Sequence, residues 1–139
     1  MITELCRKDR MAAQEQHTQY RLIVEKDRDI LHIRAMGTRT YDSLMAIVAD
    51  VMASCREQDT HKVLVDVREM KGMLSTWQAL KLVTTGFSTL RDVRILHKAA
   101  IVDLAENRER YRFLETVANN RGYNLRVFEN TDEAIEWLE

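Results

Sequence analysis

The sequence predicts an α/β fold with a mostly parallel sheet and helices packed on it. After residue 19, short β-branched runs alternate with segments of helical periodicity, and this alternation is typical of parallel strands joined by right-handed crossovers. The runs "KVLVDV" and "KAAIVDL" are apolar without alternation, as expected of strands buried on both faces. A length of 139 residues suits one domain.

The predicted order of elements is ββαβαβαβα. Tyr20–Glu25 and Ile30–Ala35 flank "KDRD" and are expected to form a hairpin. Gly37 ends this pattern. From Tyr41 to Cys55 apolar residues recur at the i, i+3, i+4 and i+7 positions of an amphipathic helix, with Thr40 as its expected N-cap.

The second half of the chain continues the alternation. "KVLVDV" is a strand, and a helix is expected from Ser75 to about Leu90, although Gly86 within it is unfavourable. "KAAIVDL" and "NLRVFE" are strands on either side of the helix "ENRERYRFLETVANNRG", which ends at a glycine. "TDEAIEWLE" is a last helix, with Thr131 as its expected cap. Residues 1–19 are polar and are interpreted as an arm or a short helix, separate from a domain at 20–139.

Composition excludes several classes of protein. Twenty-one basic and 22 acidic residues give a net charge of −1, so no overall field attracts nucleic acid or anionic lipid. No apolar run reaches the roughly 20 residues that span a bilayer, and the polar N-terminus does not have the apolar centre of a signal peptide. We therefore expect a cytoplasmic protein. Cys6 and Cys55 have no metal-ligand spacing, and Cys55 falls on an apolar helix face.

Enzyme chemistry finds little support in the sequence. The four histidines lie in separate segments without metal-ligand spacing. Ser75, His32 and Asp66 are the residue types of a hydrolase triad, but no G-x-S-x-G elbow accompanies them. Nucleotide-binding glycine motifs are also absent from a chain that has four glycines. We expect no catalysis, no cofactor and no metal.

Three segments resemble a known family. "KVLVDVREMKGM" resembles the strand that leads into the regulatory loop of STAS domains, the fold of bacterial anti-sigma-factor antagonists. "HKAAIVDL" resembles the fourth strand of that family. The ending "LRVFENTDEAIEWLE" resembles a subgroup similar to stage II sporulation protein AA. The resemblance covers Tyr20 to Glu139 and implies a STAS-like domain that binds a protein partner. In this family the typical partner is an anti-sigma kinase.

The resemblance also implies a phosphorylation site. In STAS antagonists a loop with an Asp-Ser-Ser-Gly type of motif follows the third strand, and a partner kinase phosphorylates its serine. Leu74, Ser75, Thr76 and Trp77 occupy that place here. Leucine replaces the acid and tryptophan replaces the glycine, so only the candidate hydroxyls of Ser75 and Thr76 remain.

The residues themselves favour a simpler role for Ser75. Ser75 and Gln78 match the capping box S-x-x-Q, in which the two residues satisfy free backbone amides at a helix start. Such a cap contributes typically about 1 kcal/mol. A phosphate at the same place would lie at a helix N-terminus, where negative charge is stabilised. The cap is the preferred interpretation, and the switch is the alternative.

The loop before this helix is unusually apolar. Met70, Met73 and Leu74 precede Trp77, and such a cluster is unfavourable in water unless it covers something. Trp77 is expected to pack under the loop or to line a pocket. The alternative function is therefore a carrier of a small apolar or lipid-like ligand, with a pocket near these four residues. Asp66 ends its predicted strand and marks the edge where open α/β sheets bind ligands. Self-association as a homodimer is a third interpretation.

Overall fold

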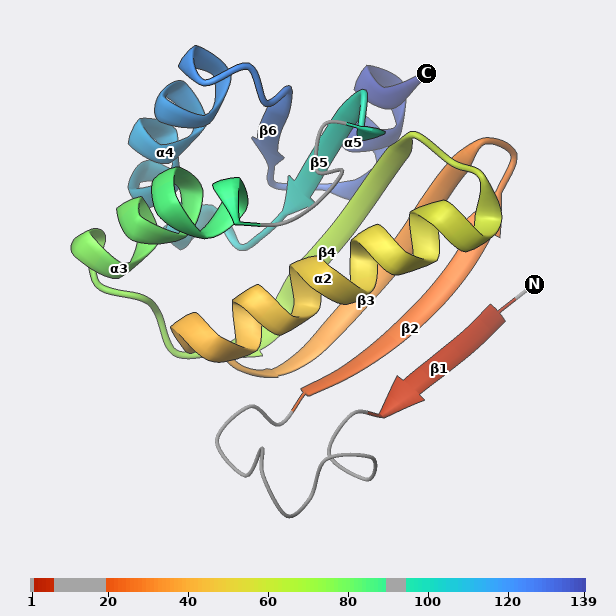
Figure 1. The fold of residues 1–139 in the computed structure, drawn as a ribbon, viewed down its shortest axis with the longest axis horizontal. Coiled ribbons are helices and arrows are strands. Elements are labelled where there is room, and N and C mark those ends of the chain that lie inside the picture. Colours follow the sequence, from red (N-terminus) through yellow and green to blue (C-terminus); the bar gives the residue numbers. More distant parts are fainter. Residues whose placement is uncertain (1, 7–19, 90–94) are drawn as a thin grey trace.

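The computed structural model describes residues 2–6, 20–89 and 95–139. Its strands form one sheet in the order β1–β2–β3–β4–β5–β6, antiparallel from β1 to β3 and parallel from β3 to β6 (Figure 1). The strands are β1 (Ile2–Cys6), β2 (Tyr20–Asp27), β3 (Ile30–Thr38), β4 (Lys62–Lys71), β5 (Lys98–Val102) and β6 (Leu125–Phe128). The helices are α2 (Tyr41–Gln58), α3 (Thr76–Lys81), the π-helix η1 (Leu82–Gly86), the 3-10 turn η3 (Ala105–Asn107), α4 (Arg108–Asn120) and α5 (Thr131–Leu138).

The predicted order is confirmed after residue 19, but the start of the chain differs from expectation. Residues 2–6 were expected in an arm or a short helix, and they form the edge strand β1, antiparallel to β2. Five residues are too few for a period-2 pattern to stand out. Pairing with β2 supplies the backbone hydrogen bonds that such a short segment lacks on its own.

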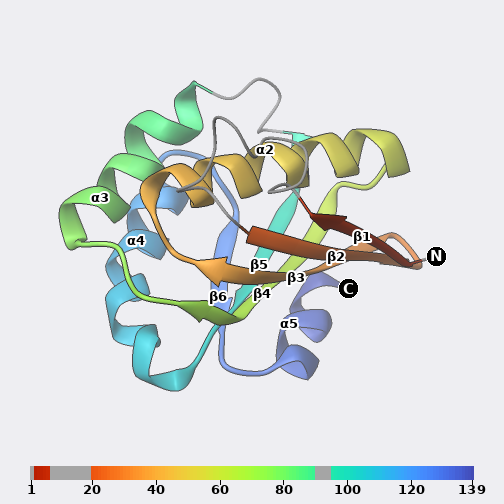
Figure 2. The same ribbon diagram turned by 90° about the horizontal axis from the view of Figure 1, so that it is seen from below.

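Helices cover the two faces of the sheet unequally. Each step from β3 to β6 moves one strand along the sheet in the same direction, so right-handed crossovers put all the connecting helices on one face. That face carries α2, α3 and α4, and α5 packs on the opposite face against β4, β5 and β6 (Figure 2). Within the described ranges, no helix is long and apolar enough to cross a membrane.

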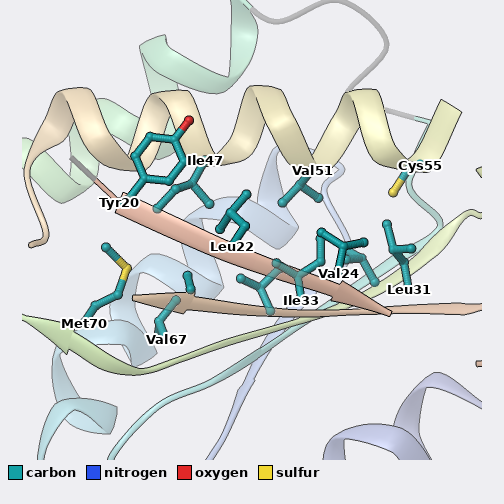
Figure 3. Packing of buried hydrophobic residues seen from close by; sticks show 13 residues of the cluster. Tyr20, Leu22, Val24, Leu31, Ile33, Ile47, Val51, Cys55, Val67 and Met70 are labelled. Carbon is teal, nitrogen blue, oxygen red and sulfur yellow. The ribbon is translucent and has the colours of Figure 1, made fainter. Parts of the chain in front are cut away.

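The main core lies between α2 and the sheet. Ile47, Val51 and Cys55 point from α2 toward β2 and β3, as the predicted periodicity requires (Figure 3). Cys55 is buried, and this burial raises the pKa of its thiol. On the opposite face, Ala134 and Leu138 of α5 are completely buried.

Helix caps follow local chemistry closely. Thr40 caps α2, and its hydroxyl accepts a hydrogen bond from the Ser43 amide at 2.9 Å. Gly122 follows α4 with a φ of 90°, a conformation that favours glycine. The expected cap of α5 was wrong by one residue: Asn130, not Thr131, accepts from the Glu133 amide at 2.8 Å.

The helix expected from Ser75 to Leu90 is confirmed as two parts, α3 and the π-helix η1, while Leu90 lies outside the described residues. Close packing against α2 explains why a glycine stands at position 86. A Cβ atom there would lie 2.8 Å from Met45 Sδ and 3.1 Å from Tyr41 Oη. The missing side chain therefore lets α2 approach η1 closely, at the cost in helix propensity noted above.

Strand β4 is longer than the predicted "KVLVDV". It continues to Lys71 because its end pairs with β3, with Met70 opposite Gly37. The register shifts between Arg34 and Met36, and after this bulge Met70 faces the α2 side, as Val67 does (Figure 3). Met70 is therefore a core residue of a strand and not part of an exposed loop.

Candidate functional site

Three connections meet at the carboxyl ends of the parallel strands, where open α/β sheets bind ligands. Arg39 follows β3, the loop Gly72–Ser75 follows β4, and Asp103 follows β5. We call this loop the β4–α3 loop. The residues that surround it form the candidate site.

A buried ion pair lies beneath the β4–α3 loop. Both carboxylate oxygens of Asp103 accept from Arg39 Nη2 at 2.9 Å, and the exposed fractions of these two side chains are 0% and 4%. Arg39 also donates to three carbonyls of β4 and the loop: those of Val67 at 3.0 Å, Met70 at 3.1 Å and Gly72 at 2.8 Å. The guanidinium therefore holds the end of β4 and the first turn of the loop.

Asp103 extends this network to the next helix. Its Oδ1 atom accepts from the Leu104 amide at 2.7 Å and from Asn107 Nδ2 at 3.1 Å. Asn107 ends η3 and directly precedes α4. One ion pair thus joins the connections after β3, β4 and β5. Its charges are matched and its lone pairs are used, which is the condition under which a buried pair is tolerated.

Asp66 does not take part in this network. Its side chain lies on the opposite face of the sheet, where it accepts from Arg68 Nη2 at 2.7 Å. Asp66 is also not the end of its strand, since β4 continues to Lys71. Ser75 lies on the α2 side of the sheet at the start of α3, so the structure does not assemble it with His32 and Asp66 into a triad.

The start of α3 has the predicted capping box. The Gln78 amide donates to Ser75 Oγ at 3.1 Å, and the Ser75 amide donates to Gln78 Oε1 at 3.2 Å. Ser75 and Thr76 are both exposed. The cap is therefore present, and both hydroxyls are accessible to solvent.

Substitution can separate the structural roles of the Ser75 and Thr76 hydroxyls. Ser75→Ala is expected to lower the free energy of unfolding by about 1 kcal/mol because it removes the acceptor of the Gln78 amide. Thr76→Ala is the matched control: it also removes an exposed hydroxyl, but one that caps nothing, and a change within about 0.5 kcal/mol is expected. Urea denaturation of both variants measures the difference. Equal losses would show that the cap is not what stabilises the start of α3.

Trp77 contradicts its expected placement. Its exposed fraction is 72%, so it neither packs under the loop nor lines a pocket. The buried positions here are taken by Leu74, just before α3, and by Ala79 within it, and Trp77 consequently points to solvent. The site thus presents a large exposed aromatic beside the exposed residues Ser75 and Thr76.

A cavity of about 200 Å³ lies between the β4–α3 loop, the helices on this face and the sheet. Met73 and Leu74 line it, as expected, whereas Met70 and Trp77 do not. Most of its walls are aliphatic side chains from α2, η1, α4 and the strands β4 to β6. They include Ile47, Val48, Val65, Val83, Ile101 and Leu114.

Two residues of α4 donate hydrogen bonds to the β4–α3 loop. Arg110 Nη1 donates to the Leu74 carbonyl at 3.3 Å, and the Tyr111 hydroxyl donates to Met73 Sδ at 3.6 Å. Burial is the main cause that raises the pKa of Tyr111 to about 12. The charge of Arg39 lowers this pKa, and the Asp103 carboxylate raises it. Tyr111 therefore stays a neutral hydrogen-bond donor at physiological pH.

Two of the described histidines, His61 and His97, contact each other at the opposite end of the sheet. The rings of His61 and His97 stack with centroids 4.6 Å apart, and His61 Nδ1 donates to the Ile95 carbonyl at 2.9 Å. Sequence spacing did not reveal this contact, because the two residues precede different strands. Among the described residues, no group of three or more His, Cys, Asp or Glu side chains gathers as metal ligands.

Comparisons with known proteins agree on the fold. A family model described as SpoIIAA-like matches residues 30–139. An anti-sigma factor antagonist from Mycobacterium paratuberculosis is similar in structure, with a TM-score of 0.55 and 13% identity over 88% of this chain and 96% of that one. An uncharacterised protein from Shewanella loihica with a SpoIIAA-like fold is also similar, with a TM-score of 0.54 and 22% identity over 86% and 93%. No curated protein matches the chain as a relative.

Proposed function

The chain belongs to the SpoIIAA-like family, and from this premise we propose that it is a cytoplasmic, non-enzymatic regulatory module that binds another protein through residues 69–78. The fold of an anti-sigma factor antagonist supports a role in protein interaction. An anti-sigma kinase or a similar signalling protein is the kind of partner that the family resemblance suggests.

Trp77 is the observation that carries this proposal. Tryptophan is among the residues that most often dominate binding energy at protein interfaces, and this one is 72% exposed at the start of α3. The Arg39–Asp103 pair fixes the loop from which α3 begins. A partner would therefore meet an aromatic anchor on a rigid support, which lowers the entropy lost on binding.

Phosphorylation of Ser75 or Thr76 would regulate such a surface. A phosphate adds nearly two negative charges at neutral pH, one or two residues from Trp77. A partner that buries the indole would have to desolvate this new charge, so modification would weaken the complex. The exposure of both hydroxyls makes them accessible to a kinase.

Native mass spectrometry of the protein purified from its own host tests this regulation. The proposal expects a mass increment of one phosphate, reduced or lost in Ser75→Ala or in Thr76→Ala. A spectrum that shows only the bare chain mass, from cells grown under several conditions, would contradict the switch. The same spectra would reveal a homodimer as a mass of two chains.

The cavity favours a second candidate function, the binding of a small apolar ligand. Its lining is largely apolar, and Met73 and Leu74 belong both to its wall and to the β4–α3 loop. Cavities with apolar walls and a few polar groups are the usual form of small-molecule sites. In the native spectra this function predicts a larger increment that disappears on denaturation.

A further inference from the structure

The charged residues of the cavity lining have one sign. Among the described residues they are Arg39 and Arg110, and none of the described acidic residues lines the cavity. Asp103 neutralises Arg39 at 2.9 Å. Arg110 donates only to the Leu74 carbonyl at 3.3 Å, and no described acidic side chain lies within ion-pair distance of it. Arg110 is exposed, so among the described residues it is the cation at the open rim of the cavity that has no acidic partner.

Hydrogen-bond donors gather at the same end of the cavity. Arg110 contacts the carbonyl of Leu74, and the Tyr111 hydroxyl contacts the sulfur of Met73, which is a weak acceptor. Thr76 also lines this end. A guanidinium is a good donor to a carboxylate, and Arg110 now donates to a neutral carbonyl that an anion would replace with a stronger acceptor. The Tyr111 hydroxyl, in contrast, already has the Asp103 carboxylate as a hydrogen-bond partner.

The size of the cavity limits what it can hold. An apolar cavity of about 150 Å³ binds benzene. At about 200 Å³, this cavity is somewhat larger than that one. The aliphatic walls continue from the Arg110 end to Leu125 at the start of β6, which suits a short chain better than a fused ring system.

We propose that the cavity binds a short single-chain carboxylate, with its alkyl chain between the helices and the sheet and its carboxylate on Arg110. The inference rests on the second candidate function and specifies its ligand. A neutral molecule with the same chain would contact the same walls, but it would leave the Arg110 guanidinium with the Leu74 carbonyl and solvent.

The test compares octanoate with 1-octanol by isothermal titration calorimetry. Arg110→Gln is expected to weaken octanoate binding about tenfold, the usual effect of removing a charged partner, and to change octanol binding less than twofold. Arg112→Gln is the matched control, because Arg112 lies on the same helix with 66% of its side chain exposed and pairs with Glu109. It should change neither affinity.

Methionine methyl signals in NMR spectra locate the ligand without any substitution. Octanoate should shift the signal of Met73, which lines the cavity, and leave that of Met36 unchanged, since Met36 alternates to the opposite face of β3 from Ala35. If Met73 shifts but Arg110→Gln weakens both ligands equally, the carboxylate role is wrong while the apolar site stands. If neither ligand shifts Met73 at millimolar concentration, the ligand site itself is wrong, and the protein-binding proposal is unaffected.

Discussion

Replacement of Asp103 by alanine is expected to lower the free energy of unfolding by about 3–5 kcal/mol, the cost of leaving a buried charge without its partner. Asp103 is completely buried, and in the variant Arg39 would keep its charge in the same buried place. The Leu104 amide and the Asn107 side chain would lose their acceptor as well. Urea denaturation measured by circular dichroism checks the loss.

Asp66→Ala provides the control for this prediction. Asp66 also pairs with an arginine, Arg68, at 2.7 Å, but 39% of the Arg68 side chain is exposed. Pairs open to solvent contribute about 0–1 kcal/mol. Equal losses in the two aspartate variants would mean that the buried pair is not what supports this edge of the sheet.

A double-variant cycle separates the pair from its surroundings. Arg39→Met together with Asp103→Leu removes both buried charges, so the double variant should be less destabilised than the sum of the two single variants. Arg39 also satisfies the carbonyls of Val67, Met70 and Gly72. Some loss should therefore remain in the double variant, because these acceptors are left without a donor.

Trp77→Ser is expected to have the largest effect on partner binding. Truncation of an interface hot spot costs about 2 kcal/mol or more, which weakens affinity by roughly thirtyfold. The stability of the free protein should change by no more than about 0.5 kcal/mol, since the indole is 72% exposed. Calorimetry measures the affinity for a partner identified by the cross-linking described below, and urea denaturation measures the stability of the free protein.

Phe113→Ser is the matched control for Trp77→Ser. Phe113 is also an exposed aromatic, with an exposed fraction of 55%, but it lies on α4. Its loss should leave affinity within a factor of about three of the original protein. If both aromatics contributed equally, the interface would extend over α4 and would not be centred on the start of α3.

Local patterns in the sequence predicted most of the fold. The spacing of Ile47, Val51 and Cys55 placed one face of α2 on the sheet, and that face is buried. The pair Ser75 and Gln78 predicted the cap of α3, which the hydrogen bonds confirm. These features depend on residues a few positions apart, so a single sequence contains the information that determines them.

Features that depend on distant residues could not be predicted in the same way. Arg39 and Asp103 are 64 positions apart, and no spacing rule connects them. The cavity likewise depends on how three helices meet the sheet. Trp77 was misplaced because its size suggested burial, whereas the orientation of α3 gives the buried positions to Leu74 and Ala79.

Site-specific photo-cross-linking in the native host tests the central claim, that this protein binds a partner through the start of α3. Benzoylphenylalanine would replace Trp77 in one variant and Glu57 in a control. Glu57 is also exposed, but it lies in the last turn of α2, which leads into the start of β4, whereas α3 follows the end of β4. The account predicts a discrete protein adduct from position 77 and none from position 57. The same adducts from both positions, or none from position 77, would contradict it.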